Sequence, residues 1–435
     1  MAERITQSQL DKILPFVEKP ARYTGGEYNS IIKEKAEVRF ALCFPDVYEI
    51  GMSHLGSRII YSALNSRDDI ACERAYTPWT DMEAKMRESK TLMYSLETKR
   101  PLKDFDIVGF SLSYELCYTN ILTMLDLAQI PFFSKERGED MPLLVCGGAS
   151  VCNIEPIADF FDCVLYGDGE EMVHEFIDVY KEAKQNGLSK HETLLALKNI
   201  KGVYIPSFYE AKYENGKFLE LKKLEKTAPD KIERRIVANL DSTPFDDYPI
   251  VPNILAVHDR VPVELFRGCT RGCRFCQAGF IYRPIRERKV DTLINQAEKM
   301  LCSTGYDEVS LFSLSSGDYS GIHELVPTLM EKLHDKNVSL SLPSLRIDSY
   351  LKDSLEQMAA GKKTGLTFAP EAGTQRMRDV INKGVTEDDL IKSTKEAFIS
   401  GWSSIKLYFM IGLPTETDED ILGIADLVRK VIDAF

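Results

Sequence analysis

Apolar residues in the first third of the chain gather into short runs that longer amphipathic stretches separate. The run at 37–44, Glu-Val-Arg-Phe-Ala-Leu-Cys-Phe, alternates and then becomes apolar, as a parallel strand entering a core does. Further strands are predicted at 107–111, 143–146 and 163–166, and helices at 53–66, 81–89, 118–129 and 155–160. This alternation predicts a doubly wound α/β domain, with helices on both faces of a parallel sheet.

The middle of the chain has a different pattern. Residues 172–200 carry apolar positions at helical spacing, and 203–224 alternate around Asn215-Gly216, a strong hairpin signal. A polar stretch with several prolines at 229–252 is typical of a linker. We expect this part to connect two domains without contributing chemistry.

Five strand–helix units follow. Strands are predicted at 261–266, 308–313, 338–342, 364–369 and 405–411, with helices at 291–304, 321–336, 349–360, 386–400 and 418–434. In barrels of this kind the chemistry lies on the loops after the strands. The chain therefore divides into an N-terminal extension (1–36), the doubly wound domain (37–180), a helical and hairpin connector (181–255) and the strand–helix series (256–435).

Composition narrows the class of protein. A chain of 435 residues with 44% hydrophobic and 28% charged residues is expected to form more than one globular domain. No run reaches membrane-spanning length, the start has no apolar leader region, and ten cysteines without such a leader indicate a reducing compartment, so we expect a cytoplasmic protein. A net charge of −13 argues against a general nucleic-acid coat.

The chemistry is concentrated in three cysteines with C-x3-C-x2-C spacing, Cys269, Cys273 and Cys276. A cubane iron–sulfur cluster is normally held by four thiolates, so a loop that offers three leaves one iron open to a small molecule. Zinc is the alternative, but it requires a fourth Cys or His nearby, and none stands between Cys276 and Cys302. The spacing favours a 4Fe-4S cluster.

This motif, with Phe275 before its last cysteine, resembles the radical S-adenosylmethionine (radical SAM) superfamily. The resemblance implies reductive cleavage of S-adenosylmethionine to a 5'-deoxyadenosyl radical, a one-electron reductant of flavodoxin or ferredoxin type, and a (β/α)6 barrel that is here truncated after the fifth unit, as in a fragment of a longer protein. The expected cofactor-binding residues follow successive strands: Phe275, Ser316, Gly317, Asp318, Arg346, Lys383, Gly412 and Pro414. Asp318 replaces the family's glutamate for the methionine amino group, and Arg346 and Arg376 are alternatives to Lys383 for the carboxylate.

The strand-end loops of the first domain resemble a cobalamin-binding domain, whose pattern is D-x-H-x-x-G, S-x-L and G-G. The matching positions here are Asp46, Tyr48, Gly51, Ser111, Gly147, Gly148, Gly167 and Gly169. Tyr48 stands where the cobalt-ligating histidine would be, which departs from the pattern; His54 is expected to begin the following helix. Glycines at strand ends let a bulky ring approach the backbone, but they also make turns in any such fold.

The specific reaction stays open. Cobalamin would imply methyl transfer or a rearrangement. A methylthiotransferase-like enzyme would need a second cluster, for which Cys43, Cys117, Cys146, Cys152 and Cys163 are available, and a non-catalytic iron–sulfur or cobalamin sensor is a further alternative. The substrate, the oligomeric state and any further C-terminal part are not predicted. A basic group around the motif suits a phosphate-bearing or RNA substrate, or neutralisation of nearby acids: Arg267, Arg271, Arg274, Arg283, Arg286, Arg288 and Lys289.

Overall fold

The computed structural model describes residues 4–334, 336–342 and 366–434, and it divides into two compact units. Unit 1 comprises residues 1–237 and 243–258, and unit 2 comprises 238–242 and 259–435. The predicted N-terminal extension and connector thus pack into the same unit as the doubly wound domain. No helix in the described part of the chain combines the length and the apolar character needed to cross a membrane.

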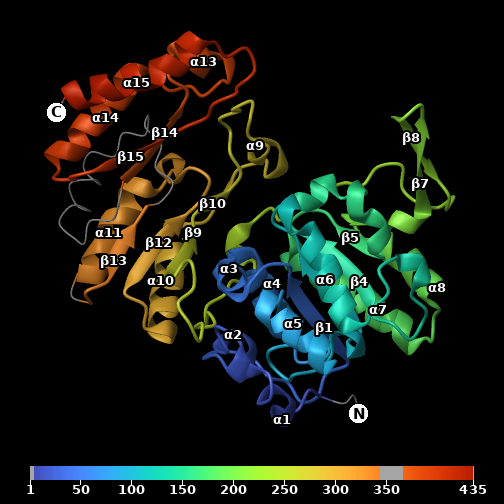
Figure 1. Ribbon diagram of the computed structural model, residues 1–435. Helices are drawn as coiled ribbons and strands as arrows, with labels where there is room; N and C mark the ends of the chain where they lie inside the picture. Colours follow the sequence, from blue (N-terminus) through green and yellow to red (C-terminus); the bar gives the residue numbers. More distant parts are fainter. Residues whose placement is uncertain (1–3, 335, 343–365, 435) are drawn as a thin grey trace. The chain divides into compact units, whose positions relative to one another are not determined.

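Unit 1 is built on a six-stranded sheet (Figure 1). Its spatial order is β2 (Ile70–Tyr76), β1 (Val38–Phe44), β3 (Ile107–Ser111), β4 (Leu143–Gly147), β5 (Cys163–Leu165) and β6 (Val203–Tyr204). The first five strands are parallel, and β6 runs antiparallel to β5. The order 2-1-3-4-5 is a doubly wound arrangement whose switch point lies between β1 and β3, where such sheets bind ligands.

Helices cover both faces of this sheet. The longer ones are α4 (Leu55–Asn65), α5 (Thr80–Ser89), α6 (Tyr118–Ala128), α7 (Gly169–Gln185) and α8 (Lys190–Leu197); the short ones are α1 (Gln7–Leu10), α2 (Ala21–Thr24) and α3 (Tyr48–Ser53). One core joins α5 and α6 to alternate strand residues such as Cys43 and Phe110. The other core joins α4, α7 and α8 to residues such as Leu42 and Val145. The predicted two-sided fold is confirmed.

Two predictions for unit 1 were wrong in detail. Strand β2 was missed because it carries Glu73 and Arg74, which are buried and charged. The predicted hairpin begins later than expected: β6 joins the main sheet, and the hairpin is formed by β7 (Tyr209–Glu214) and β8 (Lys217–Lys223). Its turn is Asn215-Gly216, and both residues have the positive φ that this turn requires.

Unit 2 repeats strand–helix units, as predicted (Figure 1). A parallel sheet has the order β13 (Ser339–Ser341), β12 (Glu308–Phe312), β9 (Val261–Glu264), and a second parallel pair is β14 (Leu366–Glu371) with β15 (Ile405–Phe409). The helices are α9 (Ala278–Ile281), α10 (Val290–Thr304), α11 (Ile322–His334), α13 (Gln375–Val380), α14 (Glu387–Ile399) and α15 (Asp418–Asp433). Within 259–434, apart from the gaps given above, no closed barrel forms. The helix predicted at 349–360 and the candidate Arg346 lie outside the described residues.

Candidate functional site

The three cysteines lie on one long loop of unit 2, which a short antiparallel ladder closes at its base. The ladder joins β10 (Phe266–Arg267) to β11 (Arg286–Glu287). Gly268 begins the loop with φ +104°, and a Cβ there would lie 2.7 Å from the carbonyl oxygen of Pro284. Only glycine therefore lets the two ends of the loop approach so closely. We call residues 268–285 the cysteine loop.

All three cysteines of the cysteine loop are partly exposed. The Cys276 N–H donates to the Cys273 carbonyl at 3.1 Å, which places these two residues in one tight turn. Among the described residues, no three Cys, His, Asp or Glu side chains converge as ligands of a single ion would. A cubane cluster does not require such convergence on one ion, because each thiolate binds a different iron atom. The donor set, three partly exposed cysteines on one loop, fits a 4Fe-4S cluster.

Asp318, the predicted partner of the methionine amino group, lies in the loop after β12. Arg271 of the cysteine loop donates from Nε to its Oδ2 at 3.0 Å, and the Ser315 hydroxyl donates to the same oxygen at 2.7 Å. Ser316 is fully buried, and its hydroxyl donates to the Leu311 carbonyl at 3.1 Å. Ser316 therefore stabilises the conformation of the loop, while Asp318 supplies its carboxylate.

Lys383, the predicted partner of the cofactor carboxylate, follows α13, the short helix after β14. Its Nζ lies 3.0 Å from Oε1 of Glu371 and 5.9 Å from the centre of the Phe275 ring. Glu371 itself has φ +69°, a left-handed backbone that is uncommon outside glycine. The structure thus brings Phe275 and Lys383 together, and it adds Glu371, whose role the sequence did not indicate.

After β15, the Gly-Leu-Pro turn is held by a carboxylate. Glu416 Oε2 accepts the N–H of Gly412 at 2.6 Å and that of Leu413 at 3.3 Å, and Gly412 has φ +91°. Pro414 is exposed beside them. The amide donors of this turn are therefore already satisfied by Glu416, and its proposed contact with adenine stays a prediction.

The basic residues around the cysteine loop are largely matched by acids and carbonyls of the same unit. Glu264, which is 8% exposed, accepts from Arg267 at 2.8 Å and from Arg288 at 3.0 Å. Burial alone would raise the pKa of Glu264, but the two guanidinium groups outweigh it and lower that pKa. Arg271 pairs with Asp318 in the same way. Three cations of this basic group, Arg267, Arg271 and Arg288, are therefore paired with carboxylates within unit 2.

The strand-end loops of unit 1 form the second candidate site. The hydroxyl of Tyr114, after β3, donates to Asp46 Oδ2, after β1, at 2.6 Å, and this bond raises the pKa of Tyr114 to about 12. The Leu112 N–H donates to the Gly147 carbonyl at 2.8 Å. Asp46, after β1, and Ser111, at the end of β3, thus border the switch point, and Ser111 pairs in register with Gly147 at the end of the next strand, β4. Tyr114 joins them as a residue that the sequence pattern did not single out.

Other candidates in unit 1 lie in close contact with the rest of the unit. Tyr48 is 1% exposed, and its hydroxyl donates to Glu27 at 3.1 Å and accepts the Asn253 N–H at 3.0 Å, so its side chain is not presented to a ligand. Four glycines lie against other parts of unit 1. A Cβ on each would approach a neighbour closely: Gly51 faces the Tyr76 ring, Gly148 faces Leu112, Gly167 faces Arg235 and Gly169 faces Ile60.

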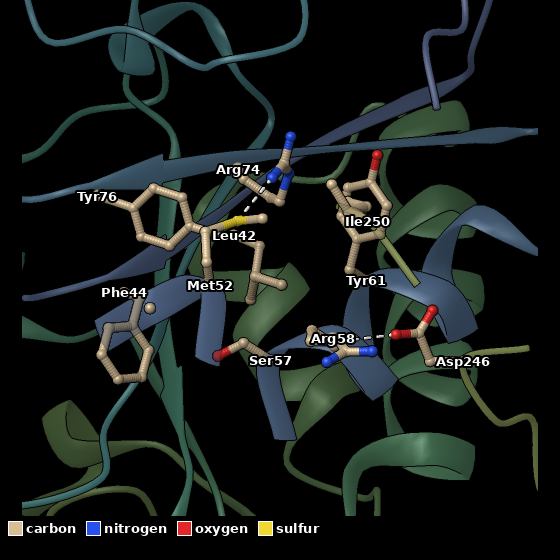
Figure 2. A pocket seen from close by; sticks show the side chains of 11 residues that line it. Leu42, Phe44, Met52, Ser57, Arg58, Tyr61, Arg74, Tyr76, Asp246 and Ile250 are labelled. Atoms are coloured by element: carbon tan, nitrogen blue, oxygen red, sulfur yellow. Dashed lines mark hydrogen bonds and ion pairs between the residues drawn. The ribbon is translucent and has the colours of Figure 1, made fainter. Parts of the chain in front are cut away.

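A pocket inside unit 1 lies between β1, β2, α3, α4 and residues 243–258 (Figure 2). Arg74 lies on one side of it, and Arg58 lies on the other, with Nε 2.9 Å from Oδ2 of Asp246. Apolar and aromatic side chains form most of the remaining wall. Of the residues predicted to contact cobalamin, Gly51 alone lines this pocket.

Comparison with known proteins assigns the family. The family model for the N-terminal part of radical SAM proteins matches residues 56–206, and the radical SAM superfamily model matches 263–428. An uncharacterized protein of Methanocaldococcus jannaschii is 31% identical over 90% of this chain and 73% of its own length. The chain belongs to the radical SAM superfamily. As a radical SAM enzyme it uses a 4Fe-4S cluster and S-adenosylmethionine, and it carries the three-cysteine motif.

Other radical SAM relatives are more distant. An uncharacterized methyltransferase of Pyrococcus horikoshii is 23% identical over 75% of this chain, which spans 65% of that relative. A tRNA-2-methylthio-N(6)-dimethylallyladenosine synthase of Syntrophomonas wolfei is 26% identical over 39% of this chain and 40% of its own length.

Two solved radical SAM structures share the fold. The methyltransferase TsrM of Kitasatospora setae has a TM-score of 0.58 at 13% identity and covers 91% of this chain and 71% of its own. The cobalamin-dependent enzyme OxsB has a TM-score of 0.61 at 14% identity, over 90% of this chain and 51% of its own. The predicted order of a doubly wound domain before a radical SAM domain is confirmed.

Proposed function

We propose that this chain binds its cluster on Cys269, Cys273 and Cys276 and cleaves S-adenosylmethionine reductively to methionine and a 5'-deoxyadenosyl radical. The observation that supports this most strongly is the set of contacts from the cysteine loop to the loop after β12 and to the segment that follows α13. Arg271 contacts Asp318, and Phe275 lies under Lys383. The thiols and the proposed cofactor-binding residues therefore gather at one end of unit 2, where enzymes of this architecture place their chemistry.

Each protein group has a positional role. Asp318, oriented by Ser315, accepts the ammonium of the methionine moiety, and Lys383, which Glu371 holds by an ion pair, borders its carboxylate. The turn at Gly412 and Pro414 packs against the adenine. The cluster, when bound, supplies the one electron that breaks the S–C5' bond, and the radical then takes a hydrogen atom from the substrate. A flavodoxin or ferredoxin is the proposed electron donor.

We further propose that unit 1 binds cobalamin and that the reaction is a methyl transfer. The strand order 2-1-3-4-5 supports a ligand at the switch point, which Asp46 after β1 and Ser111 at the end of β3 border, with Gly147 on the adjoining strand β4. The likeness to TsrM and OxsB supports it at the level of the fold. Because Tyr48 is buried and engaged, we propose binding without a protein ligand to cobalt from this position.

The methylthiotransferase-like alternative finds less support. Cys43, Cys146 and Cys163 are buried within the unit 1 core, and burial raises the pKa of each thiol, which disfavours the thiolate that a second cluster needs. Cys117 is also buried, and its Sγ donates to the Tyr114 carbonyl at 2.8 Å. A phosphate-bearing or RNA substrate remains a proposal, which the internal pairing of Arg267, Arg271 and Arg288 does not favour.

The deciding experiment is anaerobic reconstitution with iron, sulfide and hydroxocobalamin, then desalting, metal analysis and product assay with dithionite. About four irons per chain, retained cobalamin and 5'-deoxyadenosine would support both proposals. Four irons and 5'-deoxyadenosine without cobalamin would remove the methyl-transfer proposal. About eight irons would move the second-cluster alternative ahead, and a cluster without 5'-deoxyadenosine would favour a sensor.

A further inference from the structure

The carboxyl end of α13 lies against the cysteine loop through consecutive hydrogen bonds. The Arg274 N–H donates to the Ile381 carbonyl at 2.9 Å, and the Arg274 guanidinium donates to the Val380 carbonyl. The side-chain amide of Asn382 donates to the Gly272 carbonyl at 2.9 Å. The backbone on both sides of Cys273 is therefore attached to residues 380–382.

These contacts follow from the chemistry of a helix end. The last carbonyls of a helix have no partner within it and carry partial negative charge, which a cation such as Arg274 offsets. Asn382 follows the helix with φ +53°, a left-handed conformation that asparagine tolerates better than most residues. That conformation ends α13, and the Asn382 side chain then reaches the cysteine loop.

Helix α13 is in turn fixed to the end of β14. Thr374 caps its first turn by accepting the Met377 N–H, and Arg378, which is 1% exposed, donates to the Ala372 carbonyl at 2.9 Å. Gly373 lies so close to α15 that a Cβ would be 2.3 Å from the Ile424 nitrogen. The support under the cysteine loop is therefore rigidly packed on two neighbouring elements.

We propose that Arg274 and Asn382 are positioning residues that hold the cysteine loop in its binding conformation before the cluster is inserted. Cys273 is fixed from both sides, and Cys276 is tied to it by the 3.1 Å bond to the Cys273 carbonyl. The conformational entropy of these residues is thus lost when the chain folds, so its loss does not weaken cluster binding. The inference rests on the proposed function only in naming the cluster as the group that the thiols hold.

The first test uses glycine variants of two left-handed asparagines. Asn382→Gly removes the contact to Gly272 while keeping a residue suited to this backbone, and Asn337→Gly does the same at an exposed turn with φ +54°. Hydrogen exchange is measured on the cluster-free chain. We expect the amides of the cysteine loop to exchange about fivefold faster in N382G, as loss of one hydrogen bond implies, and unchanged in N337G. Equal exchange in both variants would overturn the proposal.

The second test examines the reconstituted cluster in Arg274→Gln and Arg274→Lys. We expect R274Q to retain severalfold less iron and to show an altered electron paramagnetic resonance spectrum of the reduced cluster, and R274K, which keeps the charge at the helix end, to restore much of both. Wild-type iron content and spectrum in R274Q would contradict the proposal. If the wild-type chain binds no cluster, the proposed function fails, while the exchange experiment still decides whether α13 orders the loop.

Discussion

Arg271 of the cysteine loop and Asp318 after β12 form a two-pronged ion pair. Nε of Arg271 lies 3.0 Å from Oδ2 of Asp318, and its Nη2 contacts Oδ1. The acid that we propose for the cofactor's ammonium is thus already paired with a cation from the loop that carries the cysteines. S-adenosylmethionine, which brings an ammonium and a sulfonium, has to share Asp318 with Arg271 or replace it.

Because of this ion pair, substitutions of Asp318 and Arg271 should change the affinity for S-adenosylmethionine in opposite directions. Asp318→Asn should weaken S-adenosylmethionine binding about tenfold, because a hydrogen bond to a charged group is lost. Arg271→Gln should strengthen it severalfold, because a competing cation is removed. Isothermal titration of the reconstituted protein measures both, with the exposed Asp388→Asn on α14 as control. Weaker binding in R271Q would show instead that Arg271 orients Asp318 for the cofactor.

The cluster assignment is tested by comparing two partly or fully exposed cysteines of unit 2. Cys276→Ala should lose most of the iron after reconstitution and all 5'-deoxyadenosine formation, because one iron lacks its thiolate. Cys302→Ala, at an exposed position on α10, should keep both. Iron analysis and product chromatography give the result, and equal iron in the two variants would exclude Cys276 as a ligand.

Strand β2 shows where sequence patterns fail for the fold. Nine other strands of the two units were predicted within a few residues, because their runs are apolar on at least one face: β1, β3, β4, β5, β9, β12, β13, β14 and β15. In β2, the polar Arg74 interrupts the run, yet its side chain is 5% exposed and pairs with Glu27 at 2.9 Å and Glu97 at 2.6 Å. These partners are distant in sequence, so no local pattern indicates that the charge is buried.

Arg74 should consequently be critical for the stability of unit 1. Arg74→Met leaves the carboxylates of Glu27 and Glu97 buried without their cation, and removal of one partner from such a group costs about 3–5 kcal/mol. The matched control is Arg87→Met on α5, whose partners Glu83 and Asp126 are partly exposed, and it should cost less than about 1 kcal/mol. Urea unfolding measures both, and similar costs would refute the buried-network interpretation.

The candidate site was predictable to the extent that its chemistry is local in sequence. Cys269, Cys273 and Cys276 stand within eight residues of one another, and their spacing alone indicated a cluster. The partnership of Arg271 with Asp318 crosses 47 positions, and that of Asn382 with Gly272 crosses 110, so only the fold reveals them. The glycine pattern of unit 1 was ambiguous for a physical reason, since close backbone packing and ligand approach require the same residue.

His54 makes the stability of unit 1 dependent on pH. Its Nδ1 accepts the Ser57 N–H at 3.0 Å, so the neutral ring carries its proton on Nε2, which donates to Ser113 Oγ at 3.2 Å. Burial lowers the pKa of His54 from 6.5 to about 4. Between these values the unfolded chain binds a proton that the native chain does not, so stability is full above pH 6.5 and falls as the pH drops toward 4.

The loss should amount to at most about 1.4 kcal/mol per pH unit within that window. His54→Asn keeps an acceptor that can cap α4 but does not titrate, so its unfolding free energy should vary less with pH. The measurement is the difference between wild type and H54N in urea unfolding at several pH values from 4 to 7. A constant difference would show that His54 titrates alike in both states.

Gly167 allows a test of whether the strand-end glycines serve close packing of the chain or the approach of a cofactor. It has φ +113°, and a Cβ there would lie 2.0 Å from the Arg235 carbonyl oxygen, whereas Gly187 has φ +66° with no atom within 4 Å of a Cβ. Gly187→Ala should cost about 1–2 kcal/mol from backbone strain alone, and Gly167→Ala about 1–3 kcal/mol more from the clash. Urea unfolding and cobalamin retention are measured together. If G167A is as stable as G187A but loses cobalamin, Gly167 serves the cofactor. If G167A is less stable than G187A, close packing of the chain against residue 235 is sufficient reason for a glycine at this turn.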